Sequence, residues 1–492
     1  MRDLVKASFI TWIGAAATIL AALVRGKVFA VELGPVGVGT VSQLFVFVSA
    51  AGLVGSFTLG SGIAQYVAQF TGEGAREDIR RVVQTSIALT LILGMLLAVV
   101  VWFTASQWSR WLFNGDAGYA NYIRLFSLVI VAFSLAPTLQ SVLNGLGEAF
   151  ISSGVEILLT PIIIVTVVFL LKGWKIEGAI LFFTLIAFLR VGCQVAALFR
   201  KHRDIFLGFF RFIDRRAIRQ ILTGLLKIAI GGVIIQQSDA AAQVFVRTRI
   251  IQLYSLEVNG LYQASFATAQ QVLIPAMAFI STYAFSKVNS SKTSQERTQY
   301  TNEALQLSLL IVVSGISAII LFKHAYIILL LSPKFLRSES LFPFQAAGEG
   351  FRQLGLAVGM AMLLTSGVVT WVVVGLIWAG GNAIFALVFL PLGFWALPLH
   401  YLAGGFVYFI VSWAVMSRND QFAMNLLNKQ ILFISLFFLA LLALLPFTII
   451  GITLGLLLLF IWLLFALGHY RHFVIGKLKR IFSAITANIT FS

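Results

Sequence analysis

The chain has 492 residues, of which 60% are hydrophobic and 11% are charged, and its formal net charge is +17. Soluble globular domains are about 45–50% apolar and about 25% charged, so this composition excludes a soluble globule and indicates a protein of the lipid bilayer. The positive charge does not indicate a nucleic-acid partner, because the basic residues lie in short loops between apolar segments. A single cysteine, Cys193, lies in an apolar segment, so neither a disulfide framework nor a metal cluster is expected.

Apolar segments long enough to cross a bilayer recur along the whole chain. A helix that spans the hydrocarbon core needs about 20 residues. The first segment, from Phe9, is too long for the apolar region of a cleavable signal peptide, so we expect it to be retained. The fold class is therefore an all-α polytopic membrane protein with about fourteen transmembrane helices, at 8–31, 37–62, 85–106, 122–145, 152–171, 178–199, 222–249, 259–285, 304–331, 341–365, 370–390, 394–416, 431–447 and 448–468.

The longest basic loop divides these spans into two groups. Residues 1–199 are predicted to form an N-lobe of spans one to six, and residues 222–416 a C-lobe of spans seven to twelve. The linker at 200–221 carries seven basic residues among phenylalanines. It is expected either to lie on the inner leaflet as an amphipathic helix or to act only as a charged loop. Two additional spans at 431–468 and a basic cytoplasmic tail at 469–492 follow.

The first span of each predicted lobe carries a pair of charges. Arg25 and Lys27 lie in the first span, and Arg247 and Arg249 lie 222 residues later, in the seventh. A charge in the middle of a lipid-facing helix costs at least ~2.5–3.5 kcal/mol, so such residues usually face a cavity or a partner. We therefore predict two pseudo-symmetric six-helix lobes around a positively charged cavity that takes an anionic ligand.

Arg25 and Arg247 are the first candidates for contact with an anionic headgroup. A guanidinium suits phosphate because its planar fork forms two parallel hydrogen bonds to the oxygens. Lys27 and Arg249 are the second candidates, since a spacing of two residues on a helix directs them about 160° away from the arginines. For all four side chains, the alternative is that they snorkel to the outer headgroups.

Two more cations are candidates for the same headgroup. Arg190 lies in the sixth span, and Arg352 lies in the tenth. The alternative for Arg190 is an ion pair with Glu156 of the fifth span. The alternative for Arg352 is mutual neutralisation with Glu349, which lies three residues earlier on the same helix face.

Acidic residues inside the spans are candidates for ion coupling. Asp239 lies in a polar stripe of the seventh span that ends at Arg247. It could bind a coupling proton or sodium ion, serve as a counter-charge to Arg247, or form a buried ion pair with a neighbouring helix. Glu349 and Glu32 are the next candidates. Neither a cofactor nor a metal is expected, and a proton or sodium gradient would supply the driving force.

Two segments carry motifs that are similar to those of a known family. The first contains Gly26-Lys27 and then Gly34-Pro35-Val36-Gly37-Val38-Gly39, and the second contains Leu341-Phe342-Pro343-Phe344-Gln345, Gly348-Glu349 and Arg352. They resemble the first hairpin and the tenth span of bacterial polysaccharide flippases, the translocases of lipid III and O-antigen type. The family tends to have Asp at the place of Glu349. Its closest members commonly have twelve spans, so the predicted fourteen are a departure.

The resemblance implies a pair of six-helix lobes with alternating access, related to multidrug and toxin extrusion transporters and lipid II flippases. It also implies a lipid-linked oligosaccharide as the substrate, membrane lipids and the glycan polymerase machinery as partners, and the bacterial inner membrane as the location. The predicted function is therefore a flippase that moves a polyprenyl-(pyro)phosphate-linked oligosaccharide from the cytoplasmic to the periplasmic leaflet, as in lipopolysaccharide synthesis, by ion-coupled alternating access.

Two alternatives to the flippase remain open. A multidrug or metabolite exporter of the same superfamily would be expected to have a more acidic or aromatic cavity, because its typical substrates are cationic. A membrane-embedded glycan polymerase or ligase would be expected to have a large outer loop, whereas the longest one here runs only from about Gln107 to Asn121. The chain contains neither a phosphate-binding GxxxxGK[ST] motif nor HExxH, so a secondary transporter rather than an enzyme is expected.

The distribution of basic residues predicts the orientation. Of the lysines and arginines in loops, 21 lie on one side and 5 on the other, the smaller group being Arg110, Lys172, Lys175, Lys334 and Arg337. Basic residues concentrate on the cytoplasmic side of membrane proteins. Both termini and the linker at 200–221 are therefore predicted to be cytoplasmic.

Cysteine labelling tests this orientation. In a Cys193→Ala background, a membrane-impermeant maleimide applied to intact cells should label Gly115→Cys and leave Ser290→Cys unlabelled until the membrane is permeabilised. Labelling of Ser290→Cys from outside would reverse the predicted topology.

Overall fold

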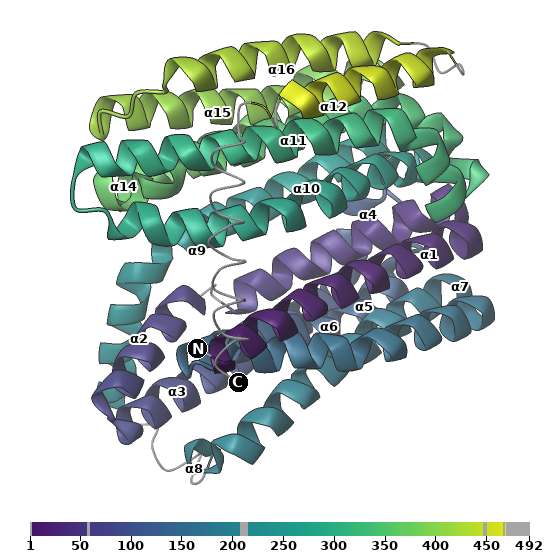
Figure 1. Ribbon diagram of the computed structural model, residues 1–492. Coiled ribbons are helices and arrows are strands. Elements are labelled where there is room, and N and C mark those ends of the chain that lie inside the picture. The colour runs from purple at the N-terminus through teal and green to yellow at the C-terminus, as the bar shows by residue number, and fades with distance from the viewer. Residues whose placement is uncertain (1, 57–59, 207–214, 446–449, 466–467, 469–492) are drawn as a thin grey trace.

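The computed structural model describes residues 2–56, 60–206, 215–445, 450–465 and 468, and helices account for nearly all of them. Figure 1 shows the long helices lying side by side in a bundle. No strand is present among these residues, which confirms the predicted all-α class. The helices of eight or more residues are α1 (Arg2–Ser56), α2 (Gly60–Glu73), α3 (Arg76–Phe103), α4 (Ala105–Leu112), α5 (Ala120–Ser127), α6 (Val129–Gly145), α7 (Ala149–Lys201), α9 (Arg215–Leu253), α10 (Leu256–Ser290), α11 (Ser294–Leu330), η1 (Pro333–Leu341), α12 (Phe342–Val358), α14 (Gly367–Phe389), α15 (Leu399–Asn419) and α16 (Leu426–Leu444).

Several shorter elements complete the described chain: α8 (Arg203–Phe206), η2 (Gly359–Ala361), α13 (Met362–Thr365), η3 (Leu390–Leu392) and η4 (Phe394–Ala396). Within the described residues, eight helices are long and apolar enough to cross a membrane, and a shorter apolar helix covers Ile450–Phe465. The protein is therefore an integral membrane protein by the length and composition of its helices.

Helix α1 is a hairpin of two antiparallel arms. A straight helix of 55 residues would extend about 80 Å, far more than the ~30 Å hydrocarbon core. The backbone breaks at Gly34, whose φ of 63° and ψ of −174° are non-helical. Phe29 and Phe45, on opposite sides of this break, both have ring centroids within 6 Å of Phe183, at 5.6 Å and 4.7 Å. The predicted boundary between the first two spans is therefore confirmed.

Helix α7 folds back in the same way. Its non-helical residue is Lys175, with a φ of 45° and a ψ of −115°. Glu156 and Arg190 lie on opposite sides of this turn, and their side chains form an ion pair with a nitrogen-to-oxygen distance of 2.8 Å. This contact brings together residues that an unbroken helix would separate by about 50 Å.

Some helix ends differ from the predicted spans. The second predicted span ends at residue 62, but α2 continues to Glu73. The predicted linker at 200–221 overlaps with both neighbouring helices, because α7 ends at Lys201 and α9 begins at Arg215. Residues 207–214 of that linker and the predicted tail at 469–492 lie outside the described residues.

The apolar core divides between an earlier and a later part of the chain. Three buried clusters are built mainly from residues between Ala21 and Ile205, and two are built mainly from residues between Ala242 and Trp462. Figure 1 shows the two parts as layers, with the purple and blue helices α1 to α7 below the green and yellow helices α10 to α16. We call them the N-lobe and the C-lobe. Helix α9 is counted with the C-lobe because it packs against α14, and it also contacts α1 and α2 of the N-lobe.

The two lobes meet tightly where the second arm of α1 crosses the start of α10. A Cβ atom added at Gly39 would lie 1.9 Å from the carbonyl oxygen of Leu256, and one added at Gly260 would lie 1.9 Å from that of Pro35. Only glycine permits this approach of the two backbones. The contact is reciprocal: Gly39 meets the residue four positions before Gly260, and Gly260 meets the residue four positions before Gly39. Such an exchange is expected at a two-fold axis.

Hydrogen bonds between the lobes strengthen the same contact. The amide nitrogen of Asn259 donates to the carbonyl oxygen of Gly39 at 2.8 Å, and that of Gln43 donates to the hydroxyl of Thr248 at 2.9 Å. All four residues are buried. The lobes are thus closed at the end that contains Gly34, which is the predicted periplasmic end.

Candidate functional site

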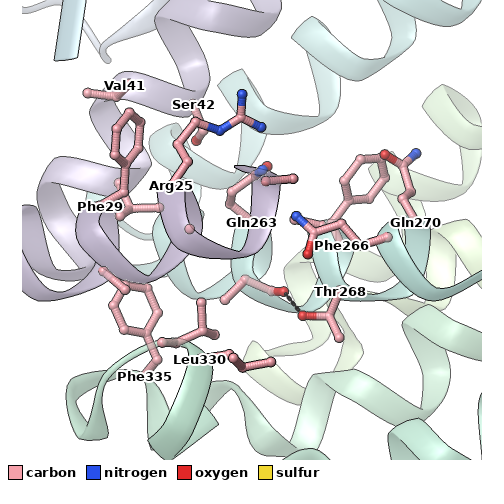
Figure 2. Close-up of a pocket in the computed structure, with 18 of the residues that line it drawn as sticks. Arg25, Phe29, Val41, Ser42, Gln263, Phe266, Thr268, Gln270, Leu330 and Phe335 are labelled. Atoms are coloured by element: carbon pink, nitrogen blue, oxygen red, sulfur yellow. Dashed lines mark hydrogen bonds between the residues drawn. The ribbon is translucent and has the colours of Figure 1, made fainter. Parts of the chain in front are cut away.

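A cavity of about 380 Å³ lies between the two lobes, next to this contact. Both arms of α1 line it from the N-lobe, and α9, α10, α11 and η1 line it from the C-lobe. Arg25 and Arg247 are both in its wall, whereas none of its described lining residues is aspartate or glutamate. Figure 2 shows Arg25, Ser42 and Gln263 around this space. The predicted pairing of the two arginines at one cavity agrees with this arrangement.

Arg247 is held by aromatic rings and not by an acid. Its side chain is buried, with 1% of the residue exposed, and its guanidinium carbon lies 5.6 Å from the ring centroid of Tyr262 and 5.2 Å from that of Phe266. Within the described residues, neither Nε nor Nη1 of Arg247 has a hydrogen-bond partner. Cation–π contacts stabilise a desolvated cation by about 2 kcal/mol, which is less than the several kcal/mol that its burial costs. The charge is therefore only partly compensated before a ligand binds.

Arg25 reaches the cavity from the N-lobe. Its guanidinium carbon lies 5.7 Å from the ring centroid of Phe183, and the residue is half-buried. Helix α1 positions it nine residues before the break at Gly34, and α9 positions Arg247 six residues before its end at Leu253. The duplicated charges thus occupy similar depths in the two lobes, on either side of one cavity.

Lys27 and Arg249 point away from the cavity, as a two-residue offset on a helix requires. The ammonium group of Lys27 donates to the carbonyl oxygen of Ile328 at 3.1 Å on an exposed part of the surface. Arg249 donates from Nη1 to the side-chain oxygen of Gln252 at 2.9 Å. Neither cation lines the cavity.

The other two candidate cations have carboxylate partners. Arg190 pairs with Glu156 at 2.8 Å within the N-lobe. Arg352 pairs with Glu349 at 3.1 Å within the C-lobe, where Glu349 is fully buried. Both ion pairs match the alternatives that the sequence left open, so these arginines are less available to an external anion than Arg25 and Arg247.

Glu349 lies at the centre of a dense polar cluster. Besides Arg352, the side-chain amide of Gln353 donates to it at 2.6 Å and the hydroxyl of Tyr401 at 2.5 Å. Three donors from α12 and α15 therefore satisfy one buried carboxylate. These contacts tie α12 to α15 through the Glu349 side chain.

Trp378 of α14 brings Asp239 to the same cluster. Its indole nitrogen donates to Asp239 at 2.8 Å. The centroid of its ring lies 5.3 Å from the guanidinium carbon of Arg352. Asp239 and Arg247 are eight residues apart on α9, which separates them by about 12 Å along the helix axis. Asp239 thus faces the Glu349 cluster and is too far away to neutralise Arg247.

The remaining predicted acid lies at the end of the first arm of α1. Glu32 forms an ion pair with Lys175 at 2.9 Å, where the turn of α1 meets the turn of α7. The side chain of Lys175 is 58% exposed. This pair ties two turns of the N-lobe together on the surface and does not reach the cavity.

Sequence reasoning missed the wall that α10 contributes. Gln263, Gln270 and Gln271 line the cavity, together with Tyr326 of α11. These glutamines recur at intervals of seven and eight residues, which is a signal for one helix face. The sequence indicates this face only weakly, because an uncharged amide costs less free energy to place inside a membrane span than a charge does.

Fold and site together define a two-lobed α-helical membrane protein with an internal cationic cavity. Residues 15–170 match the MatE family. The chain is 26% identical over 350 residues to the lipid III flippase of Escherichia coli (strain K12), which covers 70% of this chain and 82% of that protein.

Solved structures with the same fold include transporters of two kinds. The lipid II flippase MurJ in an inward closed conformation aligns with a TM-score of 0.69 at 15% identity, over 96% of this chain and 100% of that chain. An inward-facing MATE-family multidrug resistance transporter of the MOP superfamily aligns with a TM-score of 0.67 at 18% identity, over 84% and 96%.

These matches identify the class of the protein as a membrane transporter rather than an enzyme. Within that class, residues 15–170 of the N-lobe match the MatE family, and the fold is the one seen in a transporter of the MOP superfamily.

The difference between the paired and unpaired arginines leads to a stability prediction. Arg352→Met should lower the free energy of unfolding by about 3–5 kcal/mol, because it leaves the Glu349 carboxylate buried without its counter-charge. Arg247→Met should change it by less than about 1 kcal/mol, because the removed desolvation cost offsets the two lost cation–π contacts. Unfolding in one detergent, compared with the exposed control Arg200→Met, measures both. Equal destabilisation by Arg247→Met and Arg352→Met would show that Arg247 has a structural counter-charge.

Proposed function

We propose that the protein is a flippase that moves a polyprenyl-(pyro)phosphate-linked oligosaccharide from the cytoplasmic to the periplasmic leaflet of the bacterial inner membrane. Both termini are cytoplasmic in this proposal, and the glycan polymerase machinery remains a predicted partner. Two relatives support the substrate class, since one is named a lipid III flippase and another a lipid II flippase.

The observation that carries the proposal is the only partly compensated charge of Arg247 in the cavity wall that it shares with Arg25. A phosphate or pyrophosphate is an anion that must cross hydrocarbon, and two guanidinium groups from opposite lobes can share its oxygens. A cationic drug would instead be repelled by Arg25 and Arg247, and no carboxylate lines the described cavity to offset this repulsion. This absence of acids favours the flippase over the multidrug exporter.

Alternating access follows from the placement of the arginines on different lobes. The contact at Gly39 and Gly260 closes one end, and the headgroup would bind below it, between Arg25 and Arg247. Separation of the lobes at this contact would open the cavity to the periplasmic side. The bound anion lowers the repulsion between Arg25 and Arg247. It therefore favours closure of the lobes around the headgroup, before they separate at the Gly39–Gly260 contact.

Coupling to an ion gradient is proposed for Asp239. The C-lobe cluster holds two carboxylates, Asp239 and Glu349, against one guanidinium, Arg352, so one negative charge is in excess. Glu349 has three donors, whereas Trp378 is the one described donor to Asp239. A proton or sodium ion that neutralised the cluster would therefore bind at Asp239.

Replacement of the cavity arginines tests the flippase. Arg25→Ala and Arg247→Ala should each lower surface-glycan assembly about tenfold or more, because hydrogen bonds to a charged group contribute about 1.5–3 kcal/mol. Lysine at either position should retain part of the activity, since it keeps the charge and loses the fork. A glycan-defective host complemented by each variant, with protein levels checked by blotting, gives the measurement. Arg200→Ala, on the exposed end of α7, is the matched control. Normal glycan with both cavity arginines replaced by alanine would contradict the proposal.

Coupling is tested separately. Asp239→Asn should abolish gradient-dependent transport while leaving membrane insertion and unfolding temperature near those of the wild type, because the amide still accepts the Trp378 hydrogen bond but cannot take up a proton. Transport into proteoliposomes with and without an imposed gradient measures this, with the exposed Asp116→Asn as the control. If Asp239→Asn responds to the gradient as the wild type does, coupling occurs elsewhere, and Glu349 or Glu32 is the next candidate.

A further inference from the structure

The C-lobe wall of the cavity is rich in amides, and Arg247 is the one charged residue among its described lining residues. Gln263, Gln270 and Gln271 all face the cavity from α10. Figure 2 shows Gln263, Thr268 and Gln270 along this wall, with Phe266 among them. We call Gln263, Gln270 and Gln271 the amide face. A guanidinium can only donate hydrogen bonds, whereas an amide both donates and accepts, so this face offers a chemistry that the arginines lack.

Part of the amide face is without internal partners. The side-chain oxygen of Gln263 is buried, and no hydrogen-bond donor within the described residues reaches it. The side-chain oxygen of Gln271 accepts a hydrogen bond from the Tyr326 hydroxyl at 3.1 Å, which fixes the amide and leaves its NH₂ group to donate. A buried carbonyl oxygen without a partner is unfavourable, so a ligand that brings an O–H or N–H group to Gln263 is favoured.

Small residues leave room beside the amide face. Ala264 and Ala267 lie between the glutamines on α10, and Gly26 lies on the first arm of α1. A Cβ atom added at Gly26 would have no heavy atom within 4 Å. The cavity volume of about 380 Å³ is near the lower limit of small-molecule sites. It is therefore suited to a headgroup and an adjoining ring, and a longer glycan would extend beyond it.

We propose that the amide face reads the neutral sugar attached directly to the phosphate, through the hydroxyl or acetamido groups of that sugar. The cavity then has two parts, since Arg25 and Arg247 bind the anion while Gln263, Gln270 and Gln271 select the first sugar. Neutral sugars present paired donors and acceptors, which amides match in both directions. This inference rests on the proposed flippase function and adds the residues that determine its specificity.

Two probes with the same tail separate the two parts of the cavity: farnesyl pyrophosphate, and farnesyl pyrophosphate carrying one N-acetylhexosamine. Binding of each to the purified full-length protein in lipid nanodiscs is measured calorimetrically. The wild type should bind the sugar conjugate more tightly than farnesyl pyrophosphate. Gln263→Met and Gln270→Met, which keep the side-chain length and remove the amide, should each weaken binding of the conjugate about threefold to tenfold. Their affinity for farnesyl pyrophosphate should stay unchanged, which also shows that they are folded.

The outcomes distinguish this inference from the function on which it rests. Equal affinity of the wild type for both probes, or Gln→Met variants that keep the preference for the conjugate, would overturn the inference and leave the flippase intact. Failure of the wild type to bind either probe would overturn both. Gln299→Met, on an exposed position of α11, is the matched control and should behave as the wild type. A loss of preference in Gln299→Met equal to that in the cavity variants would also contradict the inference.

Discussion

The buried guanidinium of Arg247 is the constraint on which the rest of the structure depends. A cation enclosed by Tyr262 and Phe266, without a carboxylate among its described neighbours, is unfavourable unless an anion enters the cavity beside it. Helix α9 holds this charge at the junction of the lobes, because it packs against α14 on one side and against α1 and α2 on the other. Arg352, by contrast, has Glu349 as a partner, which is why we propose a ligand-binding role for Arg247 and a structural role for Arg352.

The close contact of the lobes determines where this charge can act. Gly39 and Gly260 allow the backbones of α1 and α10 to touch, and the cavity begins directly beside that contact. Because the contact is reciprocal, equivalent residues of the two lobes lie opposite each other, and Arg25 and Arg247 share one space. In the proposed function, the two charged helices form a two-sided anion site, whereas one copy would leave a lone charge in the membrane.

Much of this arrangement was predictable from the sequence, and the parts that were not have physical reasons. The offset of 222 residues identified Arg25 and Arg247, and helical geometry separated them from Lys27 and Arg249. The end of α2 was misjudged because hydropathy reports the hydrocarbon region, while a helix can continue into water. The link through Trp378 and the amide face of α10 depend on which helices become neighbours, and a single sequence does not contain that information.

The most direct test of the account is a structure of the protein with a polyprenyl pyrophosphate bound. We predict that phosphate oxygens lie within about 2.7–2.9 Å of guanidinium nitrogens of both Arg25 and Arg247, in the cavity between α1 and α10. A headgroup bound at the exposed rim near Lys27, or anywhere that leaves both arginines without phosphate contact, would contradict the claim that the paired charges form the substrate site.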